Sequence, residues 1–136
     1  DAVASDPYVV VSCAGQGVST VFIKQNCNPV WDDQHFTLRV PNLDSLIRFE
    51  VYDFNEHSHH VFLGQHLLPA ALIEMDRKYE YVCELSLKPN QKDSVARRAR
   101  SGESLGKIRV LLQLRATNVP VGEVFVNFSI LRSPPV

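Results

Sequence analysis

The chain has 136 residues, a formal net charge of −1, and 45% hydrophobic and 21% charged residues. This length suits a single domain, and the composition is that of a chain that buries a core rather than a disordered one. The near-zero charge gives no reason to expect nucleic-acid binding, and no apolar run is long enough to span a membrane. Because residues 1–6 lack the pattern of a signal peptide and the three cysteines suggest no disulfide framework, we expect a cytoplasmic protein.

Alternation of apolar and polar residues predicts short β-strands along the chain. The clearest candidates, in which nearly every second residue is apolar, are 35–40, 46–52, 107–115 and 123–131. Weaker candidates are 8–13, 18–24, 61–68 and 79–87. Only 70–77 is suited to a helical turn, and Gly, Pro and Asn residues separate the strands. This pattern predicts an all-β fold, an eight-stranded antiparallel β-sandwich.

Charge is distributed unevenly along the chain. Residues 1–56 contain three bases and eight acids, a net charge of −5, whereas 88–115 contain eight bases and two acids, a net charge of +6. The segment 88–106 has almost no large apolar residues, so we expect a mobile basic insertion there, with Arg97, Arg98 and Arg100 at its centre. These arginines precede Ser101 as in a substrate of a basophilic kinase.

Four short motifs follow one another between residues 5 and 64. They are Ser-Asp-Pro-Tyr-Val at 5–9, Asn-Pro-Val-Trp at 28–31, Phe-Glu-Val-Tyr-Asp-Phe at 49–54 and Phe-Leu-Gly at 62–64. Taken together they resemble the C2 domain, the calcium- and phospholipid-binding β-sandwich of protein kinase C and synaptotagmin. The alternative is a different β-sandwich that reuses the same Asn-Pro and Asp-Pro turns. On the C2 interpretation, residues 1–136 form a single C2-like domain.

The resemblance implies a calcium site at one end of the sandwich, where loop carboxylates and lipid phosphates surround the ions. The residues of this chain that match the family's ligand positions are Asp1, Asp6, Asp53 and Asn55. Asn55 stands where a carboxylate is usual, and Val61 occupies the last ligand position. Because affinity depends on ligand charge, we expect calcium binding to be weak or the site to be vestigial. The alternative is that Asp6 and Asp53 only cap turns.

The loops that would contact lipid also depart from the family's usual pattern. Val3 and His57 are the candidate membrane contacts, and the strand expected at 18–24 holds a single base where many members have a basic patch. His57, with His59 and His60, could bind a transition metal or become charged together below about pH 6.5. The alternative for the three histidines is a solvated polar loop.

The order of the strands departs from the family at the beginning of the chain. Most members have a strand before the first calcium loop, whereas this sequence starts at that loop. The segment 123–131, which follows the expected last strand, resembles the missing one, and we predict that it fills the vacant slot. It could do so within one chain or in a strand-swapped dimer, because an open sheet edge would promote aggregation. The alternative is that 123–131 opens the next module of a tandem array.

No catalytic motif is present, neither a Gly-x-Ser-x-Gly nucleophile turn nor a phosphate-binding glycine loop, so we do not expect an enzyme. The first functional hypothesis is a peripheral membrane module that binds anionic phospholipid with little or no calcium, within a larger protein. The second is a scaffold that binds a protein partner in membrane trafficking or signalling. No nucleic-acid partner is expected, and calcium is the one possible cofactor.

Overall fold

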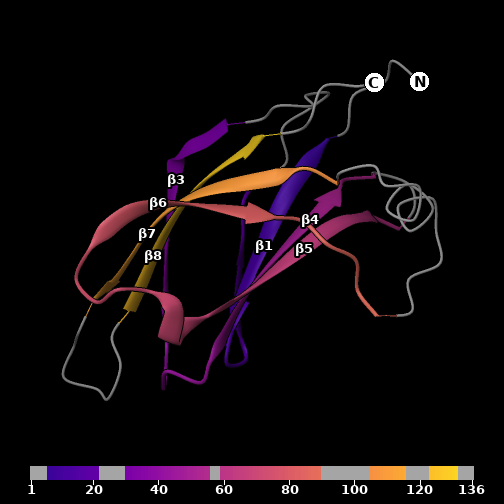
Figure 1. Cartoon of the computed structure of the whole chain (residues 1–136). Helices are drawn as coiled ribbons and strands as arrows, with labels where there is room; N and C mark the ends of the chain where they lie inside the picture. The colour runs from indigo at the N-terminus through magenta and orange to yellow at the C-terminus, as the bar shows by residue number, and fades with distance from the viewer. Residues whose placement is uncertain (1–5, 22–29, 56–58, 90–104, 116–122, 132–136) are drawn as a thin grey trace.

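The structure is a computed structural model that describes residues 6–21, 30–55, 59–89, 105–115 and 123–131. These residues form eight strands and one short 3-10 helix, η1 (Ala70–Leu72), drawn in Figure 1. The strands are β1 (Pro7–Cys13), β2 (Gln16–Ser19), β3 (Val30–Arg39), β4 (Leu46–Asp53), β5 (Val61–Pro69), β6 (Lys78–Glu84), β7 (Lys107–Arg115) and β8 (Glu123–Leu131). No helix in this part of the chain is long and apolar enough to cross a membrane.

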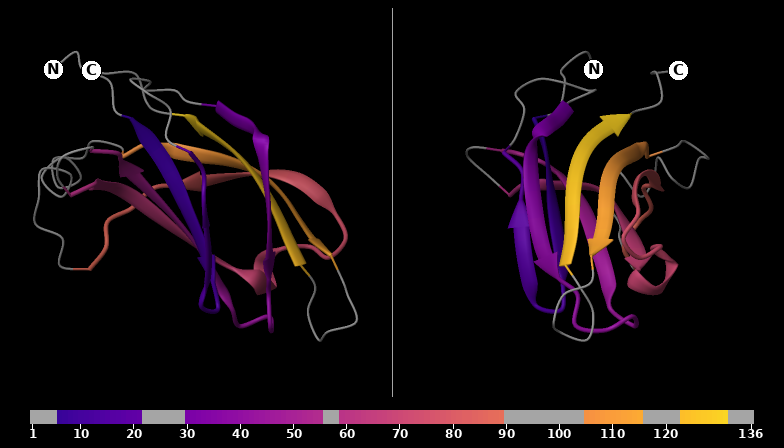
Figure 2. Two further views of the ribbon diagram at one scale, coloured as in Figure 1. Left: turned by 180° about the vertical axis from the view of Figure 1, so that it is seen from behind. Right: turned by 90° about the vertical axis from the view of Figure 1, so that its left-hand side faces the viewer.

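The strands form two four-stranded antiparallel sheets that face each other (Figure 2). One, called here the β1 sheet, has the order β2-β1-β4-β5, and the other, the β7 sheet, has the order β3-β8-β7-β6. The prediction of an all-β antiparallel sandwich is confirmed.

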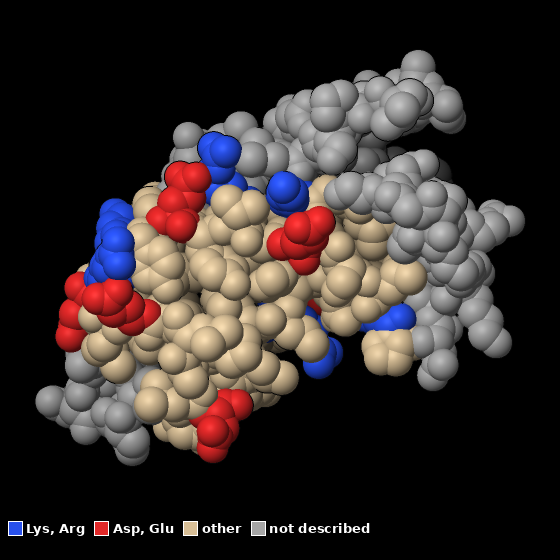
Figure 3. Space-filling model, viewed as in Figure 1, with Lys and Arg blue, Asp and Glu red and all other residues tan. Residues whose placement is uncertain are grey.

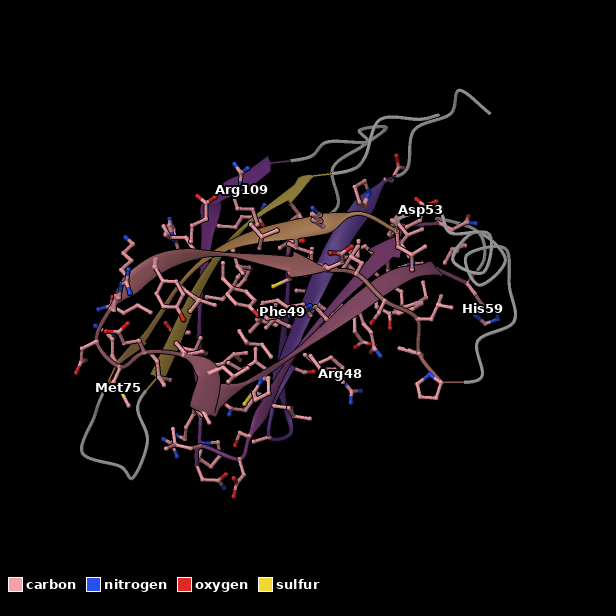
Figure 4. All side chains as sticks on the ribbon, in the orientation of Figure 1. Arg48, Phe49, Asp53, His59, Met75 and Arg109 are labelled. Carbon is pink, nitrogen blue, oxygen red and sulfur yellow. The ribbon has the colours of Figure 1, made fainter. Side chains whose placement is uncertain are left out.

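The core lies between the two sheets and follows the predicted alternation. In β1, Val9 and Val11 are fully buried and alternate with partly exposed residues, and β7 repeats this pattern. Phe49 of β4 is the largest fully buried side chain and points into the space between the sheets (Figure 4). A period of two places alternate side chains on opposite faces of a strand, so the buried residues of β1 and β7 form one face of each strand, turned toward the core.

Strand β8 lies between β3 and β7 in the same chain. Val30 of β3 pairs with Ser129, and Lys107 of β7 pairs with Leu131, so β8 is hydrogen-bonded on both sides. The segment 123–131 is therefore an internal strand of the β7 sheet and pairs in cis. That it occupies the slot of a family opening strand remains a prediction.

Three local predictions differ from the structure. The segment expected at 79–87 is divided between the sheets, because β6 ends at Glu84 and Ser86 forms an isolated bridge to Gln65 of β5, with N–O distances of 2.9 and 2.8 Å. The strand expected at 18–24 begins earlier, at Gln16, after a two-residue turn in which Ala14 and Gly15 have φ of 50° and 82°. Of the helical turn expected at 70–77, only η1 is helical.

Gly64, the last residue of the Phe-Leu-Gly motif, marks a position where no side chain fits. It has a φ of 157° and lies beside the register shift between Val51 and Tyr52. A Cβ atom placed on it would lie 2.8 Å from the Cβ atom of Leu85. The glycine therefore allows the 85–88 segment to pack against β5.

We expect Gly64→Ala to lower the free energy of unfolding by about 1–3 kcal/mol, because the added methyl group overpacks the contact with Leu85. Gly17→Ala is the matched control, since a Cβ atom there meets only the Val11 carbonyl oxygen, at 4.0 Å. Urea unfolding of both variants measures the difference. Equal stability of the two variants would contradict the close approach of Leu85.

Cys83 is a fully buried thiol in β6, and its burial raises its pKa from 9.0 to about 12. The unfolded chain releases the thiol proton near pH 9, whereas the folded chain holds it until about pH 12. The protonated thiol's contribution to the free energy of unfolding is therefore complete below pH 9 and is lost as the pH rises from 9 to about 12. Between about pH 8 and pH 10 the loss in the free energy of unfolding amounts to about 1 kcal/mol.

Urea unfolding at pH 8 and pH 10 should show a smaller decrease in the free energy of unfolding for Cys83→Ala than for the unsubstituted chain. Val110→Ala, which truncates a buried side chain of β7 that does not ionise, is the control. An unchanged decrease in Cys83→Ala would refute this account.

Candidate functional site

The pairing of β1 with β4 brings Asp6 and Asp53 together at one end of the sandwich. Pro7 lies opposite Asp53, and Oδ1 of Asp53 accepts a hydrogen bond from the backbone N–H of Asp6 at 2.8 Å. The N–H of Phe54 donates to the carbonyl of Asp6, also at 2.8 Å. Asp6 and Asp53, which flank the two loops that the sequence predicted to cooperate, thus meet here, and Figure 4 shows Asp53 at this end. We call it the loop end.

The other candidate ligands are placed less favourably. Asn55 is exposed two residues beyond Asp53, and Val61, 40% exposed, pairs with Asp53 at the start of β5. Among the described residues, no group of three His, Cys, Asp or Glu side chains is arranged to hold a metal ion. Of the predicted site residues, those outside the described ranges are Asp1, Val3, His57, Arg97, Arg98 and Arg100.

An aromatic cluster occupies the outward face of the β1 sheet next to the loop end. The rings of Tyr8 and Tyr52 stack with centroids 5.6 Å apart, and Tyr52 meets Phe62 edge-on at 5.7 Å. His60 joins the cluster through a hydrogen bond between its Nδ1 atom and the Tyr8 hydroxyl, and its ring lies 4.8 Å from that of Phe54. Burial, followed by the proximity of Tyr52, raises the pKa of Tyr8. Tyrosine and histidine have an apolar body and a polar tip, which suits the boundary between water and an apolar phase.

Lys88 closes the aromatic cluster at the side of β5. Its Nζ atom lies 2.6 Å from Oε2 of Glu50, 3.3 Å from the Tyr52 hydroxyl and 4.5 Å from the centre of the Phe62 ring. Burial lowers the pKa of Lys88, but the hydrogen bonds to Glu50 and Tyr52 outweigh it, and the net shift is upward. The ammonium therefore stays charged and fixes the first residue of the basic insertion against the sheet.

Tyr8, Tyr52 and Lys88 were not identified as site residues from the sequence, and His60 was considered only as a metal ligand or as one of three histidines that become charged together. Tyr8 and Tyr52 are 44 positions apart and become neighbours only through the register of β1 on β4, which places them directly opposite each other. Lys88 was assigned to a mobile insertion, whereas it is anchored by contacts with β4 and β5. Alternation in the sequence indicates that both tyrosines point outward from their strands. It does not indicate which residue of the neighbouring strand lies opposite each of them.

The described side chains on the face of the sandwich seen in Figure 3 carry charges of both signs. Acidic and basic side chains lie next to one another there, and most of the described surface between them is uncharged. Arg109 Nε lies 2.7 Å from Glu80 Oε1, and Arg77 pairs with Glu74 at 2.9 Å. Such exposed pairs contribute little to stability, and they cancel the charge that would attract an anionic surface.

Comparisons with known proteins agree with the resemblance to the C2 domain that the four motifs indicated. The sequence model of the C2 domain matches residues 2–87. The chain belongs to the C2 family. It is 31% identical to Protein C2-DOMAIN ABA-RELATED 8 of Arabidopsis thaliana, over 93% of this chain and 80% of that protein. It is 30% identical to GTPase activating protein 1 of Oryza sativa subsp. indica, over 89% and 76%.

A solved structure supports the fold independently. The C2A domain of plant Extended Synaptotagmin 1 superposes with a TM-score of 0.58, covering 96% of this chain and 81% of that chain at 16% identity. At this identity the likeness extends to the β-sandwich fold alone.

The described donors of this C2 domain do not match a tightly held calcium ion. Calcium takes six to eight oxygen ligands, and affinity rises with the number of carboxylates. The described part of the loop end offers the carboxylates of Asp6 and Asp53 and the amide of Asn55, and one Asp53 oxygen already accepts a backbone hydrogen bond. A weak or vestigial calcium site at these residues therefore remains a prediction.

We expect Asn55→Asp combined with Val61→Asp to raise calcium affinity at least about tenfold, because two carboxylates are added beside Asp53. The increase in melting temperature with calcium measures it, and the unsubstituted chain should show no increase at micromolar calcium. Asn55→Asp with Val82→Asp is the matched control, since Val82 is an exposed valine of β6 in the β7 sheet. If the control responds like the test variant, the added charge acts without a local site.

Proposed function

We propose that this C2 domain is a non-catalytic module that binds anionic phospholipid membranes peripherally through its loop end, with weak or no calcium dependence, in a larger cytoplasmic protein. Membership in the C2 family supports a role in membrane targeting or signalling. The observation that carries the finer proposal is the aromatic cluster beside Asp6 and Asp53, at the end where calcium ligands are few.

The cluster supports membrane contact by its chemistry. Tyr8, Tyr52, Phe54 and Phe62 are partly exposed, so their rings present apolar surface while the tyrosine hydroxyls remain available to polar groups. Aromatic residues with one polar tip favour the headgroup layer, where a ring gains apolar contact and its hydroxyl keeps a hydrogen-bonding partner. The stacking and the His60 hydrogen bond hold the rings in place, which reduces the entropy lost on binding.

The basic insertion supplies a second contribution. Segment 88–106 contains five bases and two acids, and its last residue, Gly106, accepts a hydrogen bond at 3.0 Å from the N–H of Leu85, three residues before the segment begins. Lys88 fixes one end beside Phe62. A basic segment that starts beside the aromatic cluster would add long-range attraction to anionic lipid, at about 1 kcal/mol for each base near the surface.

We expect Tyr8→Ala to weaken binding to vesicles of phosphatidylcholine and phosphatidylserine about tenfold, because the loss of one interfacial ring removes about 1.5 kcal/mol of apolar contact. Co-sedimentation with sucrose-loaded vesicles measures the affinity. Tyr79→Ala is the matched control, since Tyr79 is a partly buried tyrosine of β6, packed on the core. Melting temperatures of both variants separate a loss of contact from a loss of fold.

The same assay tests the role of calcium and of charge. Binding of the unsubstituted chain should be the same in calcium and in chelator, and it should fall as salt increases, because salt screens the basic insertion. Binding that requires calcium would refute the proposed calcium independence. An absence of binding to anionic vesicles in both conditions would refute membrane targeting.

A further inference from the structure

A hollow of about 450 Å³ opens on the β1 sheet at the end opposite Asp6 and Asp53, beside the turn between β1 and β2. It is lined by the turn and by three neighbouring strands, β2, β1 and β4, through residues that include Ser12, Gly15, Gln16, Leu46 and Arg48. β1 runs from the loop end to this turn, and the six steps of about 3.3 Å from Pro7 to Cys13 place the hollow about 20 Å from the loop end. A membrane that meets the domain end-on at Asp6 and Asp53 would therefore leave this hollow in water.

The outward face beside the hollow combines one cation with apolar surface. Arg48 lies opposite Ser12 on β1 and opposite Leu67 on β5, and Leu46 precedes it by two residues on β4. These four side chains share the outward face, because directly opposed residues and residues two apart point to the same side of a sheet. Leu46 is 47% exposed and Leu67 is 40% exposed. Figure 4 shows Arg48 pointing away from the sandwich while Phe49 points into it.

Arg48 is available for an external anion. Within the described residues it forms no ion pair, whereas Lys88, Arg77 and Arg109 each pair with an acid. The nearest acid along its own strand, Glu50, is held by Lys88 at 2.6 Å.

The wall of the hollow is preformed. The side-chain amide of Gln16 donates to the carbonyl of Arg39 at 2.8 Å and accepts from the N–H of Arg39 at 3.2 Å. These two bonds tie the β1–β2 turn to β3 of the facing sheet, so the hollow does not have to be ordered when a ligand binds.

We propose that Arg48, with Ser12 and the hollow beside the β1–β2 turn, docks an acidic side chain of a protein partner, whose apolar neighbours pack on Leu46 and Leu67. A guanidinium binds a carboxylate in a two-pronged arrangement, and one cation matches the single charge of a carboxylate better than a phosphate monoester of charge about −1.5 to −2. The Ser12 hydroxyl supplies a second donor on the same face. The position about 20 Å from the loop end leaves this site open when a membrane meets the domain end-on at the loop end.

The test uses the 136-residue chain labelled with ¹⁵N and the blocked peptide acetyl-Leu-Glu-Leu-amide, followed by chemical-shift titration. Shifts are expected at the amides of Ser12, Gly15 and Gly17. Arg48→Gln should reduce the affinity for this peptide about tenfold or more, because a charge-assisted hydrogen bond is lost. The peptide with Gln in place of Glu should show the same reduction on the unsubstituted chain.

Arg109→Gln is the matched control, since it removes one arginine from the outward face of the other sheet, and it should leave peptide affinity unchanged. Peptide binding that is absent, or equally weakened by both arginine substitutions, would overturn the proposal. A tenfold loss of vesicle binding in Arg48→Gln would also overturn it, because the site would then contact lipid. Failure of the unsubstituted chain to bind vesicles would count only against the membrane proposal.

Discussion

The register of β1 on β4 is the constraint on which the rest of this structure depends. It places Val9 opposite Val51 and Val11 opposite Phe49, so that the inward faces of both strands form the centre of the core. The same register places Tyr8 opposite Tyr52 on the outward face and brings Asp6 against Asp53 at the end. A slip by one residue would turn every inward side chain outward. Packing of the core therefore fixes the geometry of the aromatic cluster and of the loop end. The residues on that surface need not stabilise this geometry themselves.

This coupling explains how the loop end keeps its shape with few calcium ligands. In a site filled by calcium, the ion itself would hold the two loops together through shared carboxylates. Here a hydrogen bond from the Asp6 N–H to Asp53 and another from the Phe54 N–H to the Asp6 carbonyl join the ends of β1 and β4 directly. Asp53 thus has a structural role that does not require an ion. The hydrogen bond between Asp6 and Asp53 joins residues 47 positions apart, so it links the ends of β1 and β4 and differs from the local turn cap that the sequence left as an alternative to calcium binding.

The fold could be predicted from the sequence because each clear strand has a period of two and one face must be buried. Strands β4, β7 and β8 were located to within one residue for this reason. Contacts between distant segments could not be predicted, since alternation specifies a face but not a partner. The stacking of Tyr8 on Tyr52 and the pairing of Lys88 with Glu50 join residues more than 35 positions apart. The division of 79–87 between two sheets was missed because its alternation continues across the crossover at Leu85 and Ser86.

The two ends of the β1 sheet differ in chemistry, and this difference suggests how one small domain can serve two partners. At the loop end, aromatic rings surround Lys88, whose charge is largely balanced by Glu50, so contact there depends on apolar surface and on the insertion. At the turn end, Arg48 has no acid paired with it in the described structure, and it lies between exposed leucines. Because Lys88 engages Glu50, it also removes the acid that would otherwise compete for Arg48, two residues away on β4. Lys88 and Arg48 are therefore linked through the carboxylate of Glu50. Loss of Lys88 would leave the Glu50 charge unpaired, and that charge would weaken the attraction between Arg48 and an external anion.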